Sequence, residues 1–358
     1  MKWERAALVL ALAGGALLRI PGLDLRPMHT DEAVHAIKFG ALLESGTYRY
    51  DTQEYHGPTL NYFTLLPAWL AGEKTLAGVT ETTLRIVPVF FGLCLLLLIP
   101  LLPDLSPAAS ASAALLTAFS PAMVFYSRYY IQETLLVCFS FGLIVAAGRL
   151  VSGGRTGWSV MAGACAGLMI ATKETSIISA AMMALAILGL LLIRRHEMRS
   201  RHSMSERSIQ RHELPSLKSL SVRSIQRHEL LPRRPLNERS GPRHDMRLRG
   251  SMRATSIGLA LACAGAVWFL FFSSFFTNWQ GLRDSLLAFG TYFTRAGESA
   301  RHGHPWYYFL EMLAGTRGDH GPLWSEAGIV LFGLGGVWST LREEPGAVGG
   351  GRLSLIHI

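Results

Sequence analysis

Long apolar runs separated by short polar segments dominate the hydropathy pattern of this chain. A helix that crosses a bilayer needs about 20 predominantly apolar residues, and the runs predict eight such helices. We expect them at Ala6–Ile20, Leu84–Leu102, Ala108–Tyr126, Thr134–Leu150, Trp158–Thr172, Ser176–Ile193, Thr255–Phe275 and Glu326–Leu341. The predicted fold class is therefore an all-α polytopic membrane protein.

One further apolar stretch, Gly57–Ala71, is short and carries prolines near both ends. We interpret it as a helix that lies in the membrane interface, not as a span. With this assignment, Arg149 and the basic segment 194–253 fall on the side of the N-terminus, as the positive-inside rule requires. The first loop, 21–81, and the loop 278–325 then face the outside.

Composition agrees with a membrane protein, since 50% of the 358 residues are hydrophobic and the mean hydropathy is +0.28. The net charge of +9 comes from segment 194–253, which holds 16 of the 34 basic residues and only six acidic ones. This uneven distribution does not indicate a nucleic-acid partner. The segment repeats RSIQRHEL at Arg207–Leu214 and Arg223–Leu230, and its low apolar content predicts disorder. Its histidines match no standard zinc spacing, so attraction to anionic lipid headgroups is favoured over metal binding.

The predicted organisation has four parts. Residues 1–193 form an N-terminal membrane catalytic part, 194–253 a cytoplasmic insert, 254–341 further membrane helices, and 342–358 a tail. The last six residues, 353–358, resemble the translation of a sequencing-library adapter, so we expect the natural protein to continue beyond a truncated tail. The four cysteines lie in apolar runs without CxxC spacing, which is typical of buried hydrophobic residues.

Candidate chemistry gathers beside the ends of the predicted spans, in Arg26–Tyr62, Ser127–Glu133, Lys173–Glu174 and His302–Tyr308. These stretches combine carboxylates, imidazoles, basic groups and aromatic rings. Carboxylates beside a bilayer are costly unless they have a function or a partner. Helix caps, local ion pairs and an aromatic belt would explain each stretch alone. Because all four share one predicted face, we interpret them together as an active site.

The motifs in these stretches are HTDEAVHA, GTYRYD, YHGPTLNY, SRYYIQET, TKET and HPWYY. The chain resembles a family of bacterial and archaeal polytopic proteins related to the protein O-mannosyltransferases and the lipid A aminoarabinose transferases. Some archaeal members are labelled "flippase activity-associated". The resemblance implies a GT-C-like helical bundle with interfacial helices in the first outer loop. It also implies transfer of a sugar from a polyprenyl-phosphate carrier to an acceptor, with inversion.

The resemblance also implies roles for individual residues. Asp31 matches the catalytic base of the first outer loop, and Glu133 matches the second outer acid. Lys173 and the stretch His304–Tyr308 match positions near the lipid phosphate. Arg128 and Arg301 are added on chemical grounds, because a departing phosphate needs positive charge. The candidate catalytic residues are Asp31, Glu32 and Glu133. The candidate ligands of the donor phosphate and lipid are His56, Arg128, Lys173, Arg301, His304 and Tyr307.

Glu32 follows Asp31 directly, and adjacent residues on a helix point about 100° apart. We therefore expect Glu32 to face away from the base and to serve either a metal or a helix contact. A divalent metal held by Glu32, His56 and Glu133 would suit Mg, Mn or Zn, and the sequence does not choose among them.

The expected function is that of a membrane glycosyltransferase in the cell envelope. Its expected partners are a polyprenyl-phosphate sugar donor, the lipid bilayer, and a protein or glycolipid acceptor, with no nucleic acid. The expected location is the cytoplasmic (inner) membrane, with several passes and the active site on its outer face. A transporter or flippase for lipid-linked sugars and a non-catalytic partner stay open as alternatives. A transporter predicts ionisable residues at helix midpoints, whereas those of this chain cluster at helix ends.

Overall fold

The computed structural model describes residues 2–52, 56–103, 105–153, 155–189, 191–193, 195, 242–297, 305, 307–317 and 323–342. The predicted insert between 196 and 241, the tail from 343 onward, and the predicted site residues Arg301 and His304 lie outside the described residues. The chain divides into two compact units, Met1–Ser176 with Ala254–Ile358, and Ile177–Arg253.

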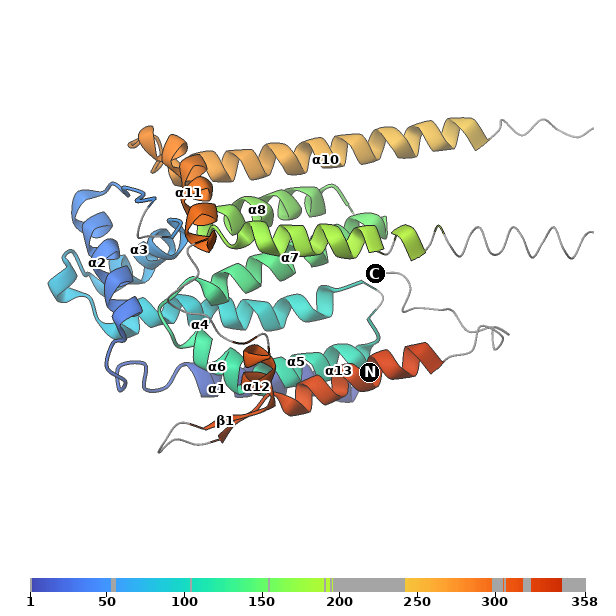
Figure 1. The fold of residues 1–358 in the computed structure, drawn as a ribbon, viewed down its shortest axis with the longest axis horizontal. Coiled ribbons are helices and arrows are strands. Elements are labelled where there is room, and N and C mark those ends of the chain that lie inside the picture. Colours follow the sequence, from blue (N-terminus) through green and yellow to red (C-terminus); the bar gives the residue numbers. More distant parts are fainter. Residues whose placement is uncertain are drawn as a thin grey trace, which may run out of the picture. The chain divides into compact units, whose positions relative to one another are not determined.

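Helices form almost all of the regular structure (Figure 1). They are α1 (Lys2–Arg19), α2 (Thr30–Ser45), α3 (Thr59–Ala71), α4 (Glu81–Leu98), α5 (Pro107–Phe119), α6 (Pro121–Ser127), α7 (Glu133–Val151), α8 (Gly157–Thr172), α10 (Pro242–Phe272), α11 (Gln280–Gly297), α12 (Tyr308–Ala314) and α13 (Ala327–Arg342), with short 3-10 turns at Leu76–Gly78 and Ile99–Leu101. Strands β1 (Thr316–Arg317) and β2 (Leu323–Trp324) form a small antiparallel pair. The predicted all-α membrane class is confirmed. The start of α10 at Pro242 lies inside the segment that the sequence assigns to the insert.

Four of the described helices are long and apolar enough to cross a membrane: Glu81–Leu101, Glu133–Val151, Ser176–Ile193 and Ala254–Phe272. The pair α5 and α6 would make a fifth span, bent by 60°. The sequence predicted eight. The difference arises because α8 and the apolar part of α13 are shorter than a full span, and because α1 carries four charged residues within its 18 positions.

The bend between α5 and α6 is held by two polar side chains from distant parts of the chain. Fully buried Arg19, at the end of α1, donates from Nη1 to the Ala118 carbonyl at 2.8 Å. Glu326, just before α13, accepts from the Ser120 hydroxyl and from the Ala122 N–H, both at 2.8 Å. These contacts satisfy backbone groups that the break leaves without helical partners.

Helices α2 and α3 lie together at one end of the first unit (Figure 1). Helix α3 has 13 residues and so spans about 20 Å at 1.5 Å per residue. A bilayer core is about 30 Å thick, so α3 does not cross it alone. The length agrees with the predicted interfacial helix at Gly57–Ala71.

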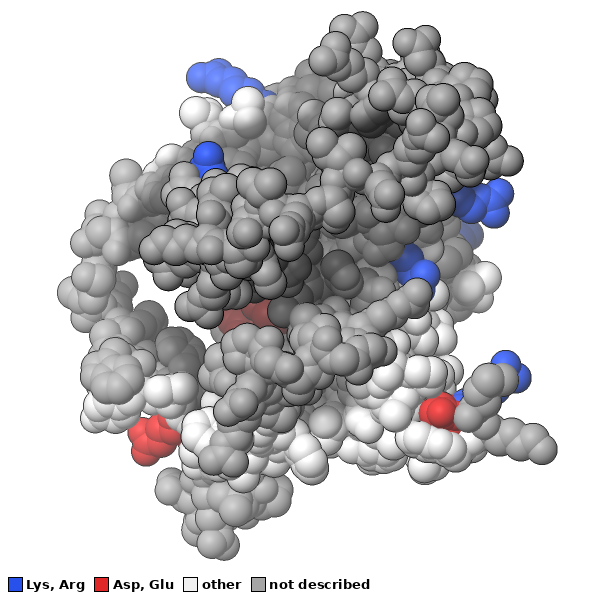
Figure 2. All heavy atoms as spheres, turned by 90° about the vertical axis from the view of Figure 1, so that its right-hand side faces the viewer, with Lys and Arg blue, Asp and Glu red and all other residues white. Residues whose placement is uncertain are grey.

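The ends of α4, α7 and α8 meet at the opposite end of this unit. Arg149 of α7 donates to the Leu101 carbonyl at 2.6 Å and stacks on Trp158 of α8. Figure 2 looks onto this side and shows Lys and Arg side chains at several separate places on it. Arg149 therefore lies at the end away from α2 and α3. This agrees with the prediction that Arg149 and the first loop, 21–81, lie on opposite sides of the membrane.

Candidate active site

Polar loops meet at the end of the first unit that carries α2 and α3. The loop after α6 reaches the first loop, since the Tyr130 N–H donates to Glu32 Oε1 at 2.9 Å. The loop after α8 joins them through Lys173, whose Nζ donates to Glu133 Oε1 at 2.5 Å. The structure thus brings together three of the four polar stretches that the sequence places on one face. The fourth, His302–Tyr308, lies largely outside the described residues.

Glu32 is fully buried, and hydrogen-bond donors surround its carboxylate. Arg85 donates from Nε and Nη2 at 2.8 and 2.9 Å, and Arg26 donates from Nη2 at 2.9 Å. The backbone N–H groups of His29 and Tyr130 add two more bonds. Burial alone would raise the pKa of Glu32, but the bonds from Arg85, Tyr130 and His29 outweigh it and hold the pKa below its ordinary value. The structure thus gives Glu32 the helix contact that the sequence offered as one alternative, through Arg85 of α4.

Asp31 lies at the exposed start of α2, and its side chain is 63% exposed. His29 caps this helix, because its Nδ1 accepts from the Asp31 N–H at 3.3 Å. Asp31 Oδ2 accepts from the Tyr129 hydroxyl at 3.2 Å, and that hydroxyl lies 2.6 Å from His29 Nδ1. Burial, and then the charge of Asp31, raise the pKa of Tyr129, which therefore stays a protonated donor at neutral pH. Asp31 is accessible, oriented and able to accept a proton.

A second polar group joins the first loop to the loop after α8. Buried Glu174 accepts from the Tyr50 hydroxyl at 2.5 Å and lies 2.8 Å from His56 Nδ1. Burial would raise the pKa of Glu174, but the bonds from His56 and Tyr50 outweigh it and lower the pKa. Gly57 lets this loop come close to α8, since a Cβ there would lie 2.1 Å from the Ala171 carbonyl oxygen. His56 is therefore held by a carboxylate and by close backbone packing.

His35 lies among the candidate site residues and is buried. Its Nδ1 is 3.3 Å from Gln132 Nε2, and its ring centroid is 6.1 Å from that of His56. Burial, and then the charge of His56, lower the pKa of His35 to about 4, while the carboxylates of Glu133 and Asp31 act in the opposite direction. His35 is therefore neutral at physiological pH and acts as a hydrogen-bonding group in the cluster.

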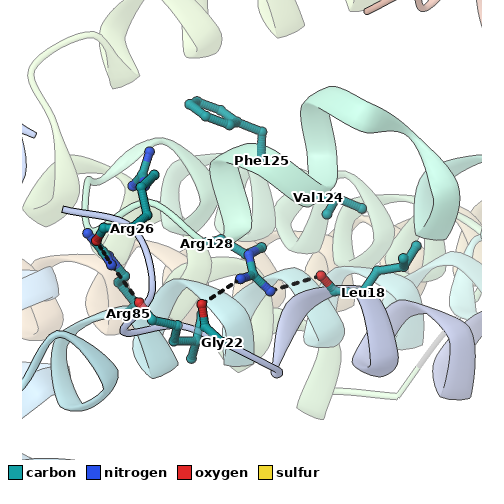
Figure 3. Close-up of a pocket in the computed structure, with 8 residues that line it drawn as sticks. Leu18, Gly22, Arg26, Arg85, Val124, Phe125 and Arg128 are labelled. Carbon is teal, nitrogen blue, oxygen red and sulfur yellow. Dashed lines mark hydrogen bonds between the residues drawn. The ribbon is translucent and has the colours of Figure 1, made fainter. Parts of the chain in front are cut away.

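Arg128, a predicted ligand of the donor phosphate, is bonded to the end of α1 instead (Figure 3). Its Nη1 donates to the carbonyls of Leu18, Arg19 and Pro21, and its Nη2 donates to Gly22 O at 3.0 Å. A helix end leaves its last carbonyls without intrahelical partners, and a cation there is favourable. Arg128 thus caps the end of α1.

The remaining predicted donor ligands have different environments. Lys173 is mostly buried and paired with Glu133, whose side chain is 40% exposed. Tyr307 lies next to the start of α12 with an exposed side chain. Arg301 and His304 fall outside the described residues. Lys173, Glu133, His56 and Asp31 all lie close enough to His35 for their charges to act on its pKa, which groups the four around that side chain.

The described residues do not support the predicted metal site. Among them, no group of three or more His, Cys, Asp or Glu side chains is arranged to hold a metal ion. The three proposed ligands have other partners: Glu32 binds Arg85, Glu133 binds Lys173, and His56 contacts Glu174. The donor set that the sequence suggested is thus divided among separate ion pairs and does not fit the ion.

Sequence reasoning missed several residues that build this site, namely Arg85, Tyr129, His35 and Glu174. Arg85 is an ionisable residue in a predicted span, a position that by itself indicates a functional or structural partner. Tyr129 and Glu174 lie in stretches that the sequence singled out, but neither was selected. Their roles depend on contacts across about a hundred residues of chain, such as Tyr129 with Asp31.

Comparison with known proteins finds similarity over part of the chain. Residues 63–205 match the family model described as dolichyl-phosphate-mannose-protein mannosyltransferase. No curated protein matches the chain. The Saccharomyces cerevisiae protein O-mannosyltransferase Pmt1–Pmt2 complex bound to the sugar donor has a similar fold, with a TM-score of 0.51 and 15% identity. That match covers 79% of this chain and 34% of the yeast chain.

A second solved structure is less similar. The archaeal oligosaccharyltransferase AglB from Archaeoglobus fulgidus, in complex with an inhibitory peptide and a dolichol-phosphate, gives a TM-score of 0.47 at 14% identity. The match covers 95% of this chain and 37% of AglB. The chain thus spans about a third of the length of the solved structures that it matches.

Proposed function

We propose that this chain, a multi-pass membrane protein with the GT-C fold and a relative of the protein O-mannosyltransferases, is a membrane glycosyltransferase. Its donor is a polyprenyl-phosphate sugar, and its active site lies at the end formed by α2, α3 and the loops after α6 and α8. This end faces the outside of the cytoplasmic membrane. The acceptor is a protein or a glycolipid.

Asp31 carries the proposal, because its carboxylate is more exposed than those of Glu133 and Glu174 and its geometry suits a base. Its carboxylate takes the proton of the acceptor hydroxyl while the acceptor oxygen bonds to the anomeric carbon. The bond from that carbon to the phosphate oxygen breaks, and the lipid phosphate leaves with the electron pair. Attack from the face opposite the phosphate inverts the anomeric centre. Tyr129 holds Asp31 Oδ2 in place through its hydroxyl.

Positive charge for the leaving phosphate comes from Lys173. Its Nζ uses one described hydrogen bond, to Glu133, and an ammonium has three donors. Glu133 orients Lys173 and is the second acid of the site. His56, fixed by Glu174, adds an imidazole to the same cluster. Positive charge of this kind stabilises a developing phosphate anion.

Replacing Asp31 by Asn tests this assignment. Asparagine keeps the shape of the side chain but removes the charge and the basic lone pair. Turnover of a panel of polyprenyl-phosphate sugars by the purified protein should fall by about 10²–10⁴-fold, the usual contribution of a positioned base. Binding of the donor lipid should change much less, because the cations hold its phosphate.

Asp24→Asn is the matched control, since Asp24 is an exposed carboxylate of the same loop. It should leave turnover unchanged. A flippase or a scaffold should tolerate Asp31→Asn as well as it tolerates Asp24→Asn. Equal activity of the two variants on an accepted donor would therefore reject Asp31 as the base.

A further inference from the structure

A separate cavity of about 230 Å³ lies between the end of α1, the start of α4 and α6 (Figure 3). Its lining combines three guanidinium groups, from Arg26, Arg85 and Arg128, with apolar side chains that include Leu18, Val124 and Phe125. Lys173 and His56 do not line it. The cavity is thus distinct from the cluster proposed to hold the donor phosphate.

The charges around this cavity do not balance. The three arginines share one carboxylate, Glu32, which is bonded to Arg85 and Arg26. Arg128 is bonded only to neutral carbonyls in the described structure. Burial, and then the positive charges of Arg26 and Arg85, lower the pKa of Arg128. The cavity wall therefore carries an excess of positive charge that an anion would relieve.

Arg26 is the arginine with donors to spare. Its side chain is 40% exposed and packs over the rings of Phe125 and Tyr129, with its Cζ 5.5 and 5.0 Å from the ring centroids. Its Nη2 donates to Glu32, whereas Nε and Nη1 have no hydrogen-bond partner among the described residues. An arginine presents a planar fork of donors that suits a phosphate. The stacking holds that fork in place at the cavity.

The surroundings of the cavity are apolar and exposed, which favours a lipid over a soluble anion. Leu18, Phe125 and Tyr126 each expose about 40% of their surface, and Leu25 exposes 82%. Leu18 lies one residue before the end of α1. An apolar surface beside a cationic fork matches the boundary between acyl chains and headgroups of a bilayer.

We propose that this cavity is a binding site for an anionic phospholipid, whose phosphate pairs with Arg26 and whose acyl chains lie along Leu18 and Phe125. The lipid is additional to the sugar donor. Because Arg26 stacks on Tyr129, which bonds Asp31, an occupied cavity fixes the side chain that orients the proposed base. The binding itself does not depend on the proposed glycosyltransferase function.

Native mass spectrometry of the purified, detergent-solubilised protein tests the proposal. The protein is titrated separately with phosphatidylglycerol, phosphatidylcholine, inorganic phosphate and a polyprenyl phosphate. Arg26→Gln removes the cation whose Nε and Nη1 donors are unused among the described residues, and Val124→Trp fills the cavity without changing its charge. Leu17→Trp is the matched control, because Leu17 is 72% exposed on α1 and does not line the cavity. Thermal unfolding shows whether each variant is folded.

The wild-type protein should bind phosphatidylglycerol at least about tenfold more tightly than phosphatidylcholine, because the choline cation of phosphatidylcholine cancels its phosphate charge beside a positively charged wall. Both cavity variants should lose about tenfold in phosphatidylglycerol affinity, and Leu17→Trp should lose none. Unchanged affinity in folded Arg26→Gln protein would overturn the site. Equally tight binding of inorganic phosphate would overturn the lipid assignment. Loss of polyprenyl-phosphate binding alone in the cavity variants would show a donor site instead of a second lipid site.

Discussion

Replacing Glu32 by Gln is the sharpest test of the different roles of the two adjacent acids, in which Asp31 is the proposed base and Glu32 the structural partner of Arg85. The carboxylate has no exposed surface, and Arg85 is only 1% exposed. Glutamine keeps one acceptor oxygen but turns an NH₂ group toward arginine donors. Removing one partner of a buried ion pair typically costs about 3–5 kcal/mol, because the other charge stays buried without compensation. This is a large share of the roughly 5–15 kcal/mol that stabilises a typical domain.

The assay is thermal unfolding of the purified variants in detergent, followed by intrinsic fluorescence, with turnover measured in parallel. Glu32→Gln should unfold at a clearly lower temperature. Asp31→Asn, a substitution of the same kind one residue away, should change stability by no more than about 0.5 kcal/mol, because its side chain is exposed. If Glu32→Gln alone proves too unstable to purify, the Glu32→Gln, Arg85→Gln double variant should be less destabilised than the sum of its parts, since the two residues are in direct contact.

The pH dependence gives an independent measurement. The pKa of Glu32 is lower in the folded protein than in the unfolded chain. Its stabilising contribution is therefore present above the unfolded-state pKa of about 4.3, and it is lost as the pH falls toward the folded-state value. The wild-type unfolding temperature should fall on acidification more steeply than that of Glu32→Gln. Normal stability of Glu32→Gln, combined with lost turnover, would refute this reasoning and identify Glu32 as a catalytic group.

Three further outcomes are expected. Gly57→Ala should destabilise the protein by about 1–3 kcal/mol in thermal unfolding, because the added Cβ would overlap a backbone carbonyl of α8. Gly157→Ala is the control and should be neutral, because open space surrounds Gly157. Tyr129→Phe should keep the fold but lower kcat about tenfold, because Asp31 loses its hydroxyl partner; unchanged kcat would remove Tyr129 from the site. A cysteine at Thr52 should react with an impermeant maleimide from outside intact cells, and labelling only after permeabilisation would reverse the proposed orientation.

The sequence alone was sufficient to predict the helical membrane class and much of the helix order. In a bilayer, a long apolar run must satisfy its backbone hydrogen bonds internally, and a helix does so within one segment. Length also distinguished the short helix α3 from a span. The break inside the predicted span Ala108–Tyr126 was missed, although Pro121 gives a local reason for it, since proline starts helices and interrupts their interiors.

The candidate site was only partly predictable. The polar stretches were visible because charged and aromatic residues stand out beside apolar runs. Their pairings were not visible, because Lys173 with Glu133 and His56 with Glu174 join different loops. The assignment of Arg128 to a phosphate followed from its charge, whereas the structure uses that charge to cap α1. An arginine can bind either a phosphate or backbone carbonyls, and the fold determines which of these groups lies within its reach.

Asp31 and Glu32 illustrate the boundary between the two sources of information. The sequence determined that two carboxylates lie side by side at the start of a helix, and helical geometry separates their directions by about 100°. Only the tertiary structure decided which of them is buried. Arg85 of α4 donates two hydrogen bonds to the buried Glu32 carboxylate. The Asp31 carboxylate stays accessible beside Tyr129. Contacts between residues so far apart in sequence depend on the packing of whole helices, which the local pattern of residues does not specify.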